Sequence, residues 1–135
     1  MPSSCLSGIR ILLVEDHASL RSVLRQFLLE KGATVTTCGS ASDGADKVRR
    51  EQPELVLTDL NLPDADGFQL MTNIRRFDAE SGRNTRVLAM SALGDFVAEE
   101  LAIAAGFYSY LPKPFSPRQL LMAIRRALGL KTQGG

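Results

Sequence analysis

The sequence is poor in residues that build soft-metal sites or disulfides: it has one histidine and two cysteines, and no tryptophan. A single histidine argues against a multi-histidine metal centre. Cys5 and Cys38 lack C-x-x-C spacing, so they indicate neither a zinc site nor a disulfide framework. Such cysteine usage is typical of a reducing compartment, and we expect a cytoplasmic protein. His17 is expected only to start a helix, and Cys38 only to fill a small buried space.

An excess of one charge and long apolar runs are also absent. The 16 basic and 15 acidic residues give a net charge of +1, which favours binding neither to nucleic acid nor to a membrane. No apolar run approaches the roughly 20 residues that span a bilayer. Residues 1–8 lack the basic and apolar regions of a signal peptide. We expect residues 1–8 to be flexible and residues 131–135 to form a C-terminal tail.

The remaining composition is that of a folded domain, with 44% hydrophobic and 23% charged residues. Strand-like apolar runs alternate with helical segments five times. The strands are predicted over residues 9–14, 33–37, 54–58, 86–90 and 108–111. Because each parallel step needs a crossover connection, this alternation predicts one α/β domain over residues 9–130. Its parallel sheet would carry helices on both faces.

Apolar residues at helical spacing predict an amphipathic helix after the first strand. They are Leu20, Val23, Leu24, Phe27 and Leu28. Three further helices are predicted over residues 41–50, over 67–78 and, after a polar loop at residues 79–85 and the fourth strand, over 94–105. A capping box at Ser116 with Pro117 in the first helical position predicts the last helix, to about residue 128.

Polar side chains stand where the predicted strands end. Glu15 and Asp16 follow the first strand, Asp59 follows the third, Ser91 follows the fourth and Lys113 follows the fifth. Because the carboxyl ends of parallel strands share one edge of the sheet, we expect these five side chains to converge there.

Three carboxylates at one edge repel one another, and a hard divalent cation relieves that repulsion. Mg²⁺ takes oxygen ligands and keeps several waters, so Asp16 and Asp59 are candidate direct ligands and Glu15 a candidate through water. A carboxylate beside Mg²⁺ can attack a phosphoryl group, while Lys113 and Ser91 bind its oxygens. The G-x-x-x-x-G-K-[ST] motif is missing, so the phosphate is not expected to belong to a nucleotide.

These motifs resemble the receiver domains of two-component response regulators, the flavodoxin-like (CheY-like) phosphoacceptor family. The matching stretches are Val14-Glu15-Asp16, residues 57–63 around Asp59, Asp66-Gly67, Met90-Ser91-Ala92 and residues 110–115. They span roughly residues 9–130. The resemblance implies a five-stranded parallel sheet in the order 2-1-3-4-5 with five helices.

The resemblance also implies a phosphorelay role. Asp59 would accept a phosphoryl group from a phosphohistidine on a sensor histidine kinase or a histidine phosphotransfer protein. Mg²⁺, or Mn²⁺, would assist. The implied metal ligands are Glu15, Asp16, Asp59 and the backbone carbonyl of Asn61.

Other residues would sense the phosphoryl group and transmit the change. The resemblance implies that Ser91 and Lys113 bind the phosphate and that Ser91 and Tyr110 form a switch pair. It also implies a cis Lys113–Pro114 peptide bond, which is reasonable for an X-Pro bond in a tight turn. The switched surface would comprise the fourth helix, fifth strand and fifth helix.

The fourth helix carries apolar residues on more than one side. Val97, Leu101 and Ala104 are predicted to form its buried stripe. A second set is predicted to form an interface with a protein partner or a second copy of the chain. These interface candidates are Phe96, Ile103, Phe107 and Tyr108. Leu93, two residues after Ser91, is predicted to slow hydrolysis of the phosphoryl group by limiting access of water.

The rival interpretations differ in chemistry. A Mg²⁺-dependent phosphatase with an aspartyl nucleophile would need a general acid near Asp59, and Asn61 stands there instead. A flavodoxin-type cofactor binder would need a polar phosphate loop after the first strand. A constitutive interaction module would not need the acidic set. We expect a regulator rather than an enzyme, either as a stand-alone receiver or as part of a larger protein such as a hybrid kinase.

Overall fold

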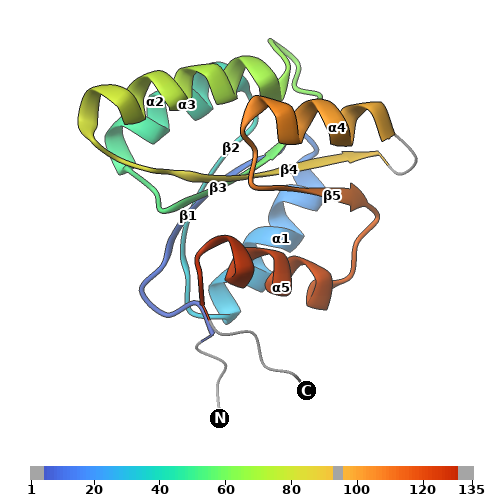
Figure 1. Cartoon of the computed structure of the whole chain (residues 1–135). Helices are drawn as coiled ribbons and strands as arrows, with labels where there is room; N and C mark the ends of the chain where they lie inside the picture. Colours follow the sequence, from blue (N-terminus) through green and yellow to red (C-terminus); the bar gives the residue numbers. More distant parts are fainter. Residues whose placement is uncertain (1–4, 93–95, 131–135) are drawn as a thin grey trace.

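The structure, a computed structural model, describes residues 5–92 and 96–130, without the side chains of residues 96–98. Its elements, in chain order, are β1 (Arg10–Val14), α1 (Ala18–Glu30), β2 (Thr34–Cys38), α2 (Ala41–Glu51), β3 (Leu55–Asp59), α3 (Gly67–Ser81), β4 (Arg86–Ala92), α4 (Phe96–Ala105), β5 (Ser109–Lys113) and α5 (Pro117–Ala127). Figure 1 shows the sheet between two helical layers, with α2, α3 and α4 on one face and α1 and α5 on the other. None of the helices described is long and apolar enough to cross a membrane.

The five strands are parallel and lie in the order β2-β1-β3-β4-β5, which confirms the predicted fold class. The chain enters the sheet at β1 and moves first to one side and then to the other, so β1 and β3 are neighbours at its centre. Asp59 is the register partner of Met90, which places Ser91 one residue farther along the same edge. The strand order reverses between β1 and β3. Open α/β sheets bind ligands at the carboxyl edge beside such a reversal, which is called the topological switch point.

Two apolar cores hold the layers together. On β1, Leu12 and Val14 belong to the core under α2, α3 and α4. Ile11 and Leu13 belong to the core under α1 and α5. Successive strand residues point to opposite faces, so a strand buried on both sides reads as a continuous apolar run. This is why β1, β3 and β4 were recognisable from the sequence.

Three helices start at polar N-cap residues, of which Ser116 was predicted. The side chains of Ser40, Asp66 and Ser116 each accept a hydrogen bond from the backbone N–H three residues later, as N-cap residues do. The end of α3 differs from the prediction, because this helix continues to Ser81 instead of giving way to a loop at residue 79. Gly82 ends it in a left-handed conformation, with φ of 73°.

Part of the N-terminal segment packs against the domain. Leu6 is fully buried in the core under α1 and α5. Its N–H donates to the Lys31 carbonyl at 2.8 Å, and the Arg125 guanidinium donates to the Cys5 carbonyl at 2.6 Å. The predicted flexibility of residues 1–8 is therefore wrong at Leu6. The predicted tail at residues 131–135 lies outside the described residues.

The apolar spacing predicted more buried residues in α1 and α4 than the structure shows. In α1, Leu24 and Leu28 are buried, but Val23 is 64% exposed. In the described part of α4, residues 99–105, the buried side chain is that of Ala102, while Leu101 is 54% exposed and Ala104 is also exposed. The predicted stripe of α4 is therefore wrong at Leu101 and Ala104, and the side chain of its third member, Val97, is outside the description. Among the side chains described for α4, the small Ala102 is packed, and the larger Leu101 and Ile103 lie outside.

Phe107 is a core residue, so its prediction as an interface residue is wrong. It is 3% exposed and meets Phe68 edge to face, with ring centroids 5.8 Å apart. Gly106, with φ of 105°, ends α4 and lets the chain turn inward. The exposed Ile103 and Tyr108 remain candidates for an interface.

Candidate functional site

Charged side chains from the ends of three strands meet at the carboxyl edge of the sheet. The Lys113 Nζ lies 2.6 Å from Asp59 Oδ2 and 2.8 Å from Glu15 Oε1. The Glu15 side chain is fully buried, that of Asp59 almost so, and that of Lys113 is 22% exposed. The predicted convergence of Glu15, Asp59 and Lys113 is thus present as a compact ion triad.

The triad shifts the titration of its members. Burial by itself would raise the pKa of Glu15, but hydrogen bonds from Lys113 and His17 outweigh burial and lower it. Burial would likewise lower the pKa of Lys113, but hydrogen bonds to Asp59 and Glu15 raise it. Both groups are therefore charged at neutral pH, and each buried charge has a partner.

Asp59 is positioned by its own loop. Its Oδ1 accepts the Asn61 N–H at 2.8 Å, so both carboxylate oxygens have donors. A side chain at Gly67 would come within 2.8 Å of the Asp59 carbonyl oxygen. Only glycine lets α3 start so close to β3. The Asp66-Gly67 pair marked this position in the sequence.

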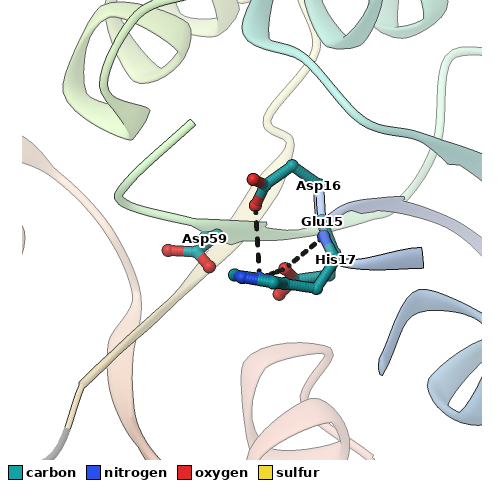
Figure 2. A group of neighbouring side chains, drawn as sticks. All are labelled: Glu15, Asp16, His17 and Asp59. Carbon is teal, nitrogen blue, oxygen red and sulfur yellow. Dashed lines mark hydrogen bonds and ion pairs between the residues drawn. The ribbon is translucent and has the colours of Figure 1, made fainter. Parts of the chain in front are cut away.

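His17 also joins the acidic group, as Figure 2 shows. Its Nδ1 lies 3.0 Å from Glu15 Oε2 and 3.5 Å from Asp16 Oδ1. One ligand atom from each of Glu15, Asp16, His17 and Asp59 lies within 4.8 Å of the others. His17 is the N-cap residue of α1, but its side chain makes no capping bond. No chemistry was predicted for His17, and its place next to Asp16 was the signal in the sequence that pointed to this contact.

Other contacts brace the loops around the site. Arg21, on the first turn of α1, donates to the Glu15 carbonyl at 2.7 Å. Asp64, in the β3–α3 loop, accepts the Ala41 and Ser42 N–H groups at 2.8 and 2.9 Å. Those backbone hydrogen bonds lower the pKa of Asp64. Neither brace was predicted from the sequence, and the one made by Asp64 joins segments more than 20 residues apart in the chain.

The resemblance implies that Ser91 and Tyr110 respond to the phosphoryl group. They lie on β4 and β5. Ser91 is buried near the end of β4. Tyr110, on β5, is half-buried, and its hydroxyl donates to the Ala92 carbonyl at 3.1 Å. The Lys113–Pro114 peptide bond is cis, as predicted. Leu93 lies outside the described residues, as does the side chain of Phe96.

A cavity of about 720 Å³ opens beside the triad. Asp59 and Lys113 line its polar end. Its apolar wall includes Leu20, Val23 and Phe27 of α1 and Phe115 from the segment before α5. Val23 was predicted from its helical spacing to lie on the apolar face of α1. It is exposed and forms part of this wall.

The donor set suits a hard divalent cation. Three carboxylates supply oxygen ligands of the kind that Mg²⁺ prefers, and the exposed Asp16 leaves the group open to solvent. Lys113 compensates only part of the negative charge of Glu15, Asp16 and Asp59. The contact of Asn61 with Asp59 described above is made by its N–H. The role of its backbone carbonyl as a metal ligand stays a prediction.

Comparison with known proteins agrees with this geometry. The sequence model of the response regulator receiver domain family matches residues 11–125. The chain is 33% identical to the DNA-binding transcriptional regulator NtrC of Azospirillum brasilense over 94% of its length, and 41% identical to the transcriptional activator protein PfeR of Pseudomonas aeruginosa over 82%. It spans only 26% and 35% of those two regulators. It spans 91% of a 14.6 kDa protein of Leptolyngbya boryana, with 31% identity over 90% of this chain.

Solved structures show the same fold. The receiver domain of sensor histidine kinase PA1611 of Pseudomonas aeruginosa, which has a magnesium ion coordinated in its active site cleft, is 30% identical. It superposes with a TM-score of 0.81 over 91% of this chain and 99% of that one. A response regulator of Chloroflexus aurantiacus gives 0.83 at 26% identity, over 90% and 98%. With its acidic pocket on a five-stranded parallel sheet, this chain belongs to the response regulator receiver domain family, the regulatory receiver domains of two-component systems.

Proposed function

We propose that Asp59 is the phosphoacceptor, taking a phosphoryl group from a phosphohistidine on a sensor histidine kinase or a histidine phosphotransfer protein. The observation that carries this proposal is the state of the Asp59 carboxylate. It is buried, ionically paired with Lys113 at 2.6 Å, held by the Asn61 N–H at 2.8 Å, and faces an open cavity. A loop carboxylate without chemistry is usually solvated instead.

The transfer is a displacement at phosphorus. A carboxylate oxygen of Asp59 attacks, the P–N bond of the donor breaks, and the imidazole nitrogen keeps the bonding pair and takes a proton. Lys113 moves from the carboxylate to a phosphoryl oxygen, and Ser91 donates to another. Glu15, Asp16, Asp59 and the Asn61 carbonyl would hold a Mg²⁺ or Mn²⁺ ion, which would supply positive charge to neutralise the phosphoryl oxygens.

The cavity beside Asp59 is the docking surface that we propose for the donor. Its apolar wall on α1, with Val23 64% exposed, offers area to a helix that carries the phosphohistidine. The polar end holds the accepting carboxylate. A donor seated on this wall would bring its imidazole to Asp59 without any movement of the sheet.

The response would appear on the opposite layer. Ser91 and Tyr110 lie on adjacent strands, and Tyr110 already holds the Ala92 carbonyl. Movement of Ser91 toward a phosphoryl group would alter that contact and the surface of α4, β5 and α5. We propose that Leu101, Ile103 and Tyr108 there meet a protein partner or a second copy of the chain.

A small phosphodonor tests the acceptor without any partner. Incubation with phosphoramidate and Mg²⁺, followed by intact mass measurement, should show the gain of one phosphoryl group. Asp59→Asn should abolish the gain, whereas Asp64→Asn, the same change five residues later, should keep it. A wild-type protein that gains nothing, or an unaffected Asp59→Asn variant, would contradict the proposal and leave a constitutive interaction module.

A further inference from the structure

We infer that His17 is an additional ligand in the cation site, and that its imidazole makes the site favour transition-metal ions such as Co²⁺ over Mg²⁺. The inference rests on the proposed function, because the carboxylates of Glu15, Asp16 and Asp59 supply the remaining ligands. It concerns the identity of the ion and a residue that the phosphoryl-transfer chemistry does not use.

The spacing of the candidate ligand atoms fits one ion. Two atoms at right angles around an octahedral ion, each about 2.1 Å from it, lie about 3.0 Å apart. Around a tetrahedral ion they lie about 3.4 Å apart. The His17 Nδ1 lies 3.0 Å from Glu15 Oε2 and 3.5 Å from Asp16 Oδ1. An ion placed among these three atoms would therefore need little rearrangement.

The position of His17 is set by the backbone, and its ring, which contacts Glu15 Oε2 through Nδ1, can exchange that contact for a metal ion. The His17 N–H donates to Glu15 Oε2 at 3.1 Å, which fixes the start of α1 next to the acids. The side chain is 71% exposed. A neutral ring can keep its proton on Nε2, toward water, while Nδ1 offers a lone pair to the metal.

The two carboxylate oxygens of Glu15 contact different partners, and this favours binding of an ion between Glu15 and His17. Oε1 accepts from Lys113 at 2.8 Å, and Oε2 faces the His17 ring. An ion that replaces the contact between the ring and Oε2 leaves the ion pair of Glu15 with Lys113 intact. The phosphoryl site and the nitrogen ligand are therefore compatible.

The chemistry of the imidazole predicts the preference. Imidazole nitrogen suits Fe, Ni, Cu and Zn ions, whereas carboxylate and water suit Mg²⁺, and affinity rises from Mn²⁺ through Co²⁺ to Cu²⁺. A site made only of carboxylates and a carbonyl lacks this bias toward nitrogen-binding ions. Adding one nitrogen should strengthen Co²⁺ binding and leave Mg²⁺ binding nearly unchanged.

The test measures binding of Co²⁺ and Mg²⁺, separately, to the untagged protein and to His17→Ala and His17→Gln. We expect Co²⁺ affinity to fall about ten-fold or more in both variants, and Mg²⁺ affinity to change less than about three-fold. Proton NMR of the Co²⁺-loaded protein should show a hyperfine-shifted ring N–H signal. His17 is the only histidine, so that signal has one possible source and must vanish in both variants.

The outcomes separate this inference from the proposed function. If the protein binds both ions but the ring signal is missing, or if both affinities fall equally in His17→Ala, His17 only positions Glu15 and the inference is wrong, while the phosphoacceptor site stands. If the wild-type protein binds neither ion, the proposed cation site fails together with the inference.

Discussion

Two surfaces of this domain expose apolar side chains, and they differ in what lies beside them. The α1 surface, made by Leu20, Val23 and Phe27, is hollowed and ends at Asp59 and Lys113. The α4 surface, made by Leu101, Ile103 and Tyr108, presents its side chains to solvent on the other layer. Exposed apolar area by itself does not tell an input surface from an output surface. We propose that the adjacent charged residues do, and that they make the α1 surface the input surface and the α4 surface the output surface.

The two surfaces are connected by a short path through β5. Lys113, at one end of that strand, holds Asp59, and Tyr110, three residues earlier, holds the Ala92 carbonyl. We propose that a change in charge at Asp59 would reach the edge of the α4 surface through β5 and its neighbour β4. Four substitutions test this division of labour, from the largest expected effect to the smallest.

Lys113→Met should disturb both surfaces, because it removes the cation from a buried triad. We expect a loss of about 3 kcal/mol in the free energy of unfolding at pH 7, since two carboxylates then remain buried without their partner. Urea denaturation measures it. Added Mg²⁺ should restore part of the loss, and an unchanged unfolding midpoint would contradict the triad as a stabilising element.

The same variant should change the pH dependence in a defined direction. The pKa of Glu15 is depressed in the folded protein, so its stabilisation is present above the ordinary value of 4.5 and is lost as the pH falls through the depressed pKa. The pKa of Lys113 is raised, so its contribution is present below 10.5 and is lost as the pH rises through the raised pKa. The difference between wild type and Lys113→Met should therefore be large from about pH 5 to 10 and shrink near pH 4.

Val23→Asp should affect only the input surface. A charge on the apolar wall should slow transfer from a phosphohistidine donor about ten-fold, which corresponds to ~1.4 kcal/mol. Phosphorylation by phosphoramidate should not change, because a small donor needs no wall. Rapid-quench transfer assays measure the first rate and intact mass the second. Equal effects on both donors would mean that Val23 acts on the acceptor and not on docking.

Ile103→Asp should give the reverse pattern. Transfer from the phosphohistidine donor should keep its rate, while association of the phosphorylated chain with its partner or with itself should weaken about five-fold, or ~1 kcal/mol. Analytical ultracentrifugation with and without phosphodonor measures the self-association. Val23→Asp serves as the matched control, and a similar loss in both variants would erase the distinction between the surfaces.

Tyr110→Phe should have the smallest effect. It removes the hydroxyl that bonds the Ala92 carbonyl at 3.1 Å, and one partly exposed neutral hydrogen bond contributes about 0.5 kcal/mol. The unfolding free energy should therefore hardly change. Hydrogen exchange in β4 and α4 should become less sensitive to phosphorylation, and an unaltered response would remove Tyr110 from the path.

Periodicity and strand ends account for much of the agreement between sequence and structure. The continuous apolar runs of β1, β3 and β4 are typical of strands buried on both faces, and the parallel order of the strands brings Glu15, Asp59 and Lys113 to one edge. Helical spacing was less informative. It identified α1 and α4 as helices but could not tell the buried Leu24 from the exposed Val23.

Local chemistry was enough for the order of the elements, the helix cap at Ser116 and the set of charged residues, because each depends on neighbours in the chain or on the ends of strands. The cis Lys113–Pro114 bond was predicted only from the resemblance to the receiver family. The burial of Phe107 and Leu6 and the exposure of Leu101 depend on which layers meet and how closely. Those contacts join residues whose separation in space is set by packing. A periodic pattern shows that a residue lies on an apolar face, but only the neighbouring layer determines how much of that face is covered.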